Sequence, residues 1–304
     1  MTGRLTTIAV AVALHLAAVS LEGQTTQQPV TKPASQNRQQ LTKALQDYRD
    51  KQDLHGEAIT LLQLGIADAG AGNVDAAQSN LAEAAKKMRV QNDLIGVWLA
   101  LVTMSQLDVA VGHSSEAVSH LEKALEVLNE AKTSSAPFNL ETFSALGAGA
   151  GVSIQLPPGL NDAALAALKP MMIQFSLEPL THDLYGSVLT QVGQLEKAEA
   201  ELNAAVAGAI YAQGMYDFSI EMHFGDIRVR QQRYDEARTH YMKALKASSK
   251  TEQLGTGGQL IKAGIYDRLA RLEAATGHSA EAKRWSTKAR DLSKGRSEAA
   301  SSPE

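Results

Sequence analysis

The chain has 304 residues, a formal net charge of −4 and no cysteine. A protein without cysteine has no disulfide framework, no thiolate zinc site, no cysteine nucleophile and no lipid-modified cysteine. Aromatic residues make up 5% of the chain, and alanine and leucine are common, which favours packed helices over strands. The near balance of charges gives no broad basic field for binding nucleic acid or anionic lipid.

The first twenty residues have the pattern of a secretory signal. Arg4 precedes an apolar run from Leu5 to Val19, and Ala18-Val19-Ser20 provides small residues for a signal peptidase. The run is shorter than the roughly 18–20 residues that span a bilayer, so an uncleaved anchor is the weaker interpretation. An N-terminal amphipathic helix is the other alternative, but the run has no charged face. We expect residues 1–20 to be removed, with no stable membrane insertion afterwards and a periplasmic or secreted mature protein.

A polar stretch follows, and then apolar residues return at a fixed interval. Residues 21–38 include two prolines and many glutamines, which predicts a disordered spacer. Beyond it, apolar and small residues with the i, i+3, i+4 spacing of one helical face recur every 40 residues. The matching sets are Leu41, Ala44 and Leu45, then Leu81, Ala84 and Ala85, then Leu121, Ala124 and Leu125.

Five turns separate the helices of five predicted pairs. Four of them contain glycine, which supplies the left-handed backbone that ends a helix. Five residues after each central turn position stands an alanine, small enough for two helices to approach closely. The turn positions are Gly72, Gly112, Gly193, Gln232 and Gly277, and the alanines are Ala77, Ala117, Ala198, Ala237 and Ala282.

This pattern resembles the tetratricopeptide repeat (TPR) family over residues 39–294. Its best match is Leu61, Leu64-Gly65, Gly72, Ala77, Leu81 and Ala84, and similar sets follow Tyr185-Gly186 and Phe224-Gly225. The turns are 40, 81, 39 and 45 residues apart, whereas the family repeats about every 34, and the closing proline is missing. The resemblance implies an all-α solenoid of antiparallel helix pairs in a right-handed superhelix. An unrelated helical bundle would not repeat turn and alanine in phase.

The interval of 81 residues predicts a degenerate repeat over about 131–179. Its centre, 147–159, contains four glycines and two prolines and cannot stay helical. Apolar residues in this segment favour a fold over a groove face, and docking of a partner is the alternative. Asn161 is a suitable N-cap for a helix over 162–175, Pro170 should kink or divide that helix, and Pro179 should separate it from the next. Residues 295–304 are expected to form a disordered tail.

The sequence shows no catalytic or metal-binding motif. The glycines at 147–151 lack the spacing of a nucleotide loop, the histidines form no HExxH, and Ser187 lacks the frame of a nucleophile elbow. We therefore expect no enzyme activity, cofactor or metal. A hydrolase in the central segment has no nucleophile and base to support it.

Transferred by phase, the family resemblance implies a groove lined by the first helix of each pair. The N-terminal half of this groove is apolar and the C-terminal half is polar, which suits a helix and an extended peptide, respectively. Two of the charged sets are also i, i+4 pairs that could simply satisfy each other, namely Asp226 with Arg230 and Asp267 with Arg271. The candidate partner-binding residues are Leu62, Ile66, Val102, Asp183, Ser187, Gln191, Met222, Asp226, Arg230, Asp267 and Arg271.

The sequence therefore predicts an exported, non-catalytic scaffold that binds a protein or peptide and no nucleic acid. The alternative is a regulatory or accessory subunit of an envelope enzyme such as a peptidase, because TPR-like arrays often accompany peptidases.

Export gives a direct prediction. N-terminal sequencing of the exported protein should begin near Leu21, because the small residues of Ala18-Val19-Ser20 precede that point. A cytosolic pool that keeps Met1 as its only form would contradict it.

Overall fold

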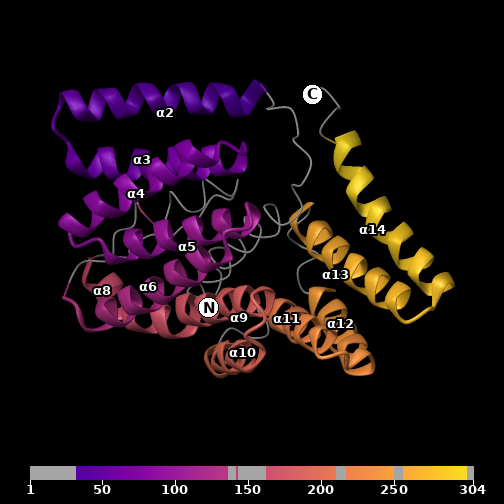
Figure 1. Ribbon diagram of the computed structural model, residues 1–304. Helices are drawn as coiled ribbons and strands as arrows, with labels where there is room; N and C mark the ends of the chain where they lie inside the picture. Colours follow the sequence, from indigo (N-terminus) through magenta and orange to yellow (C-terminus); the bar gives the residue numbers. More distant parts are fainter. Residues whose placement is uncertain (1–31, 136–141, 143–161, 210–216, 250–255, 300–304) are drawn as a thin grey trace. The chain divides into compact units, whose positions relative to one another are not determined.

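The protein is described here from a computed structural model, over residues 32–135, 142, 162–209, 217–249 and 256–299 (Figure 1). The described part contains helices and turns and no strand. The chain divides into two compact units, residues 1–181 (unit 1) and residues 182–304 (unit 2). The helices are α2 (Lys32–Asp50), α3 (Leu54–Gly70), α4 (Val74–Val90), α5 (Leu94–Ala110), α6 (Ser114–Thr133), α8 (Asp162–Met172), the π-helix η1 (Ile173–Leu177), α9 (Glu178–Gln191), α10 (Leu195–Ala209), α11 (Asp217–Arg230), α12 (Tyr234–Ala247), α13 (Thr256–Ala275) and α14 (Ser279–Ala299).

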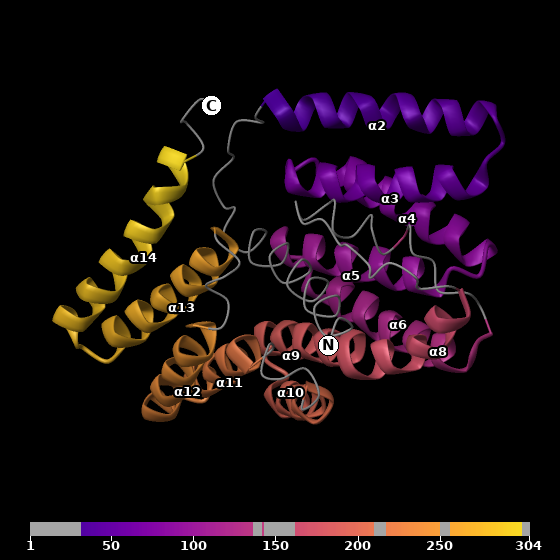
Figure 2. The ribbon, with the colours of Figure 1, turned by 180° about the vertical axis from the view of Figure 1, so that it is seen from behind.

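Consecutive helices pack against one another within each unit. In unit 1, α3 pairs with α4 and α5 with α6, while α2 covers α3 and α4 packs on α5 (Figures 1 and 2). In unit 2, α11 pairs with α12 and α13 pairs with α14. In addition, α10 packs on α11, and α12 packs on α13. The predicted all-α array of helix pairs is therefore confirmed.

The turn between the two helices of a pair has the conformation that the sequence predicts. Four of the five central positions are glycines with φ between 76° and 83°, and the fifth is Gln232 with φ 60°. In each turn the next residue donates its N–H to a carbonyl five residues earlier, as from Asn73 to Asp68 at 2.9 Å. This bond satisfies a carbonyl that the end of the helix leaves free.

Small residues let the paired helices touch. Ala77, Ala117, Ala198 and Ala237 are all 0% exposed, as the alanine spacing predicts. A glycine of the first helix faces a large side chain of the second in three pairs: Gly65 meets Leu81, Gly186 meets Leu202 and Gly225 meets Tyr241. A Cβ added to any of these glycines would lie within 2.7 Å of that side chain.

The two prolines around η1 interrupt the chain less than predicted. α8 continues through Pro170 to Met172, and α9 begins at Glu178, so that Pro179 lies inside α9. The prediction that Pro179 separates two helices is wrong. The N–H of Glu178 bonds the carbonyl of Ile173, five residues back, and this wider π register accommodates a proline at the next position.

Both ends of the helical array extend beyond their predicted bounds. α2 begins at Lys32, so the disordered spacer predicted for 21–38 is wrong over its last residues. Pro33 stands in the first turn of α2, where its missing N–H costs no helical bond. α14 continues to Ala299, into the predicted tail, through alanine, lysine and arginine, which favour helix. Residues 1–20, Asn161 and the segment 147–159 lie outside the described residues.

The close contact between α11 and α12 can be tested with two glycines. Gly225→Ala would place a Cβ 2.4 Å from the ring of Tyr241, which is 2% exposed, and should lower the unfolding free energy by about 1–3 kcal/mol. Gly264→Ala in α13 is the matched control, since its Cβ would meet nothing closer than 3.9 Å.

We expect this control to raise stability by up to about 1 kcal/mol, because alanine is the better helix former. Urea unfolding followed by circular dichroism measures both. Equal effects of the two substitutions would contradict the contact.

Candidate partner-binding surface

The apolar residues predicted for the N-terminal groove lie mostly inside the protein. Leu62 and Val102 are 0% exposed, and Ile66 is half-buried. The assignment of Leu62 and Val102 to an open groove is wrong because their helices have neighbours on several sides. α3 packs on α2 and α4, and every residue of α5 from Leu94 to Asp108 is buried. A helix that is apolar all round is a core helix.

Two residues predicted for the polar half are also buried. Asp183 is 0% exposed and Met222 is 4% exposed, so neither presents its side chain to a partner. Oδ2 of Asp183 accepts a hydrogen bond from Ser219 Oγ at 2.5 Å, and its Oδ1 lies 2.7 Å from Nδ1 of His223. Asp183 therefore holds α9 against α11, which corrects its predicted role as a ligand contact.

Asp226 forms a different pair from the predicted one. Its carboxylate accepts hydrogen bonds from Tyr241 Oη at 2.7 Å and from Nε of Arg268 at 3.1 Å, and Arg230 remains exposed. Burial, with Asp226 beside it, raises the pKa of the Tyr241 phenol far above its ordinary value. Asp226 thus joins α11 to α12 and α13.

The remaining predicted residues form a polar surface on the first helices of unit 2. Asp267 and Arg271 make the predicted i, i+4 ion pair at 2.6 Å, with side chains 49% and 79% exposed. We call the following residues the polar strip: Ser187 and Gln191 on α9, Arg230 on α11, and Asp267 and Arg271 on α13. All five occupy positions two, six or ten residues before a turn centre, so they lie on the equivalent face of each helix.

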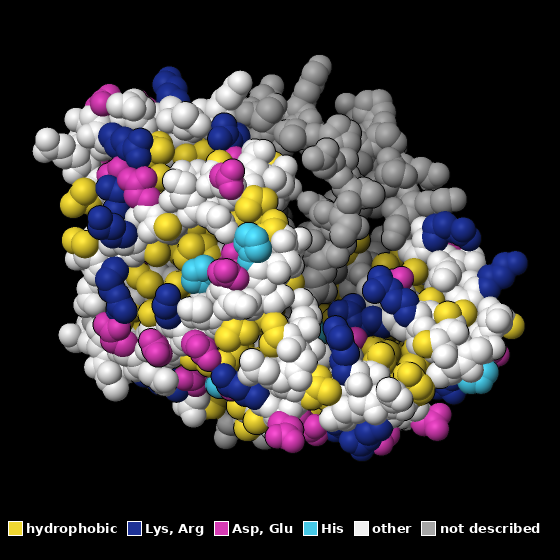
Figure 3. Space-filling model, viewed as in Figure 1, with side chains coloured by type: hydrophobic (Ala, Val, Ile, Leu, Met, Phe, Trp, Pro, Cys, Tyr) yellow, Lys and Arg dark blue, Asp and Glu magenta, His cyan; other side chains and the backbone are white. Residues whose placement is uncertain are grey.

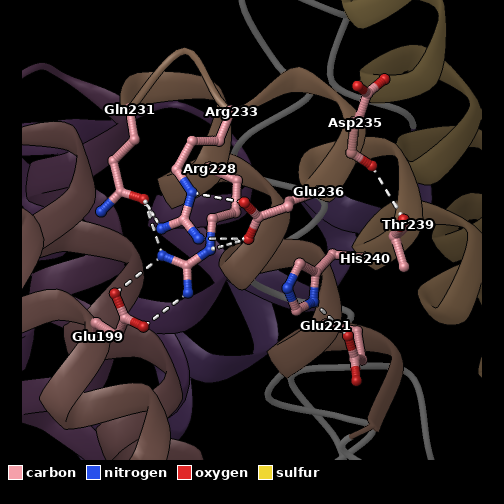
Figure 4. A network of polar contacts seen from close by, with 9 residues as sticks. All are labelled: Glu199, Glu221, Arg228, Gln231, Arg233, Asp235, Glu236, Thr239 and His240. Carbon is pink, nitrogen blue, oxygen red and sulfur yellow. Dashed lines mark hydrogen bonds and ion pairs between the residues drawn. The ribbon is translucent and has the colours of Figure 1, made fainter.

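A buried arginine that the sequence analysis missed connects three helices of unit 2. Figure 4 shows Arg228 of α11 between Glu199 of α10 and Glu236 of α12. Its guanidinium bonds both oxygens of Glu199, at 2.7 and 2.9 Å, and also bonds Gln231 at 2.8 Å, while its side chain is 10% exposed. The hydrogen bond from Arg228 lowers the pKa of Glu199 and raises that of Arg228 itself. A bidentate pair of this kind is strong and directional.

The Arg228 contact is one instance of a rule that joins successive helices across the array. The residue four positions before a turn centre is buried and polar in four of five pairs, namely Asp68, Asp108, Arg228 and Glu273. Each of these four residues bonds a side chain of the helix that precedes its own helix pair. For Asp108, Arg228 and Glu273, this bonded partner stands six positions after the previous turn centre. The contacts are Arg38 to Asp68 at 2.7 Å, Gln78 to Asp108 at 3.1 Å, Arg228 to Glu199 at 2.7 Å and Arg238 to Glu273 at 2.6 Å. We call this the inter-pair contact.

A sequence signal for the inter-pair contact exists in the turn register. A charged residue four positions before a turn centre recurs with the turns themselves, and so does its partner six positions after the previous centre. An alignment of the five turns therefore predicts both positions of the inter-pair contact.

The comparisons with known proteins agree with this geometry. The tetratricopeptide repeat family matches residues 222–251, which cover most of α11, its turn and α12. BtubC (BKLC) from P. vanneervenii has a similar structure, with a TM-score of 0.54 and 13% identity over 90% of this chain and 95% of that chain.

The chain is a TPR-like repeat protein. Acl4, the assembly chaperone of RpL4 (residues 1–338), also matches, with a TM-score of 0.35 and 16% identity over 87% of this chain and 99% of that chain. No curated protein matches the sequence.

The described part of this TPR-like chain offers exposed polar surface for contact with a partner. It contains no group of three histidine, aspartate or glutamate side chains that could hold a metal ion. Ser219, Asp183 and His223 are residue types of a hydrolase triad, yet all three are at most 5% exposed and the serine bonds the carboxylate. No helix in the described ranges is long and apolar enough to cross a bilayer. The architecture is that of a protein-interaction scaffold.

The Glu199 contact predicts how this TPR-like array responds to acid. Because the pKa of Glu199 is lowered in the folded state, its stabilisation is present above the ordinary value of 4.5 and is lost as the pH falls through the lowered folded value. Glu199→Gln should reduce the unfolding free energy at pH 7 by about 1–2 kcal/mol, a value discounted for partial exposure. The difference from wild type should shrink at pH 3.

Urea unfolding at the two pH values measures this difference. The control is Glu126→Gln on the exposed face of α6, where the described residues provide no ion pair, and it should change stability at pH 7 by less than about 0.5 kcal/mol. A Glu199→Gln defect that is equally large at pH 3 would show that the carboxylate charge is not its cause.

Proposed function

We propose that this TPR-like protein is an exported, non-catalytic scaffold that binds a peptide segment of a partner protein along the polar strip. The observation that carries the proposal is the exposure of the strip. Gln191 and Arg230 are exposed and make no hydrogen bond or ion pair with the described residues. Asp183, Asp226 and Arg228 on the same helices bond neighbouring helices, whereas Gln191 and Arg230 are available for a partner.

The chemistry of the strip favours an extended or irregular peptide. Its side chains include a hydroxyl, an amide, two guanidinium groups and a carboxylate, which together can donate to and accept from a peptide backbone. An apolar helix is a poorer match, because the apolar side chains Leu62 and Val102 are buried.

Export is the second part of the proposal. It is supported by the apolar run of residues 5–19, the preceding Arg4 and the small residues at 18–20. The absence of cysteine is compatible with export, because a helical scaffold of this size does not depend on disulfides. The net charge of −4 gives the chain no general attraction to nucleic acid.

Site-specific photo-cross-linking tests the strip as a contact surface. A photoreactive amino acid at Gln191 or Arg230 should yield a discrete cross-linked partner in cells. The same residue at Asn203 in α10 or Lys246 in α12, both exposed positions on second helices, is the matched control and should not.

Mass spectrometry of the cross-linked band identifies the partner. A recovered enzyme whose rate changes on adding the purified scaffold would favour the regulatory function over a purely structural one. Equal cross-linking from first and second helices, or none from the strip, would contradict the proposal.

A further inference from the structure

The last described helix, α14, carries half of an inter-pair contact. Lys283 stands six positions after the turn centre Gly277, where α4, α10 and α12 place Gln78, Glu199 and Arg238. Those three residues each bond the next first helix. Lys283 is exposed, and its ammonium group makes no hydrogen bond or ion pair with the described residues.

The same face of α14 continues as a cationic stripe. Thr287 and Arg290 follow Lys283 at i+4 and i+7, and Arg290 is also exposed and without an ion pair in the described part. At a rise of about 1.5 Å per residue, the two cations lie roughly 10 Å apart along the helix. We call Lys283, Thr287 and Arg290 the open face of α14.

This open face differs from the matching faces inside the array. Leu245 of α12 occupies the position that Arg290 takes in α14, thirteen residues after the turn centre. No side chain of α14 between residues 279 and 292 is buried, whereas Ala237 and Tyr241 of α12 are. The open face therefore offers charge rather than apolar surface.

Aromatic and cationic groups fix α14 on its partner helix and add to its positive charge. Trp285 stacks on Tyr266 of α13 with ring centroids 5.5 Å apart, and Lys288 lies 4.7 Å from the Trp285 ring. Arg284 lies 5.5 Å from the same ring. Figure 3 shows Lys and Arg side chains over the coloured part of α13 and α14. A cation held in this way is displayed by a rigid helix.

We infer that the open face of α14 docks a helix of a partner protein that presents carboxylates, through a copy of the inter-pair contact. The partner helix places a carboxylate against Lys283, as Glu273 of α13 lies against Arg238, and a second carboxylate about two turns away against Arg290. Charge complementarity selects this partner, because every charged inter-pair contact within the array joins a cation to a carboxylate. The surface is separate from the polar strip, so it adds a second partner site to the proposed scaffold.

The chain itself supplies the probe. A peptide of residues 256–277, labelled with an uncharged BODIPY dye and stapled as a helix on the face opposite Glu273, presents the carboxylate that this contact uses. The comparison peptide carries Glu273→Arg. The probe has a net charge of +1 from Lys262, Asp267, Arg268, Arg271 and Glu273. A general attraction to basic surfaces therefore cannot explain its binding.

Fluorescence anisotropy with the full mature chain should show binding of the probe and at least about fivefold weaker binding of the Glu273→Arg peptide. Lys283→Glu should reverse this order, so that the Glu273→Arg peptide binds more tightly than the probe, because residue 283 would then carry a negative charge. Lys86→Glu on α4 is the matched control, an exposed lysine with the same charge change and no ion pair in the described residues, and should alter neither affinity. Circular dichroism checks that both variants fold.

The proposal is overturned if the wild-type protein binds neither peptide at 1 mM peptide, or binds both equally. Tighter binding of a 20-base-pair DNA duplex or of phosphatidylglycerol vesicles than of the probe, lost in Lys283→Glu, would also overturn it, because the open face would then serve another class of polyanion.

Discussion

The close contact between the two helices of each pair determines the rest of the structure. Where Gly225 faces Tyr241, the absence of a Cβ lets a second helix approach until a large side chain fills the gap. A contact this tight permits one register, because sliding either helix would drive a side chain into backbone. The register then decides which residues lie before and after each turn, and so where polar groups meet.

The inter-pair contact is a consequence of that register, and it gives the pairs an order. A buried charge needs a partner, because desolvation without one costs several kcal/mol. Arg228 has Glu199, and Glu273 has Arg238. If the pairs α11–α12 and α13–α14 exchanged places, Glu199 would face Glu273, another carboxylate. A buried alanine at the same position recurs in four of the five pairs, so these charges distinguish one neighbour from another.

The features set by local spacing could be predicted from the sequence, and those set by neighbouring pairs could not. Turn glycines and inner alanines depend on residues within one helix pair, and the turns and four of the five alanines are placed as predicted, whereas Ala282 is half-buried. Leu62 and Val102 were misplaced because a stripe on a first helix meets both its partner and the preceding pair, which periodicity alone does not separate. Asp226 has a partner 42 residues away, Arg268, although Arg230 is only four away.

An all-helical surface also limits how a partner can be recognised. Helices satisfy their own backbone groups except at their ends, so the described residues offer no strand edge for a partner to extend. Recognition on these helices depends on side chains, and Gln191 and Arg230 both stand two residues before a turn centre. There the free carbonyls carry partial negative charge, which Arg230 offsets at the end of α11. The polar strip thus combines the exposed amide of Gln191 and guanidinium of Arg230 with the exposed ion pair of Asp267 and Arg271.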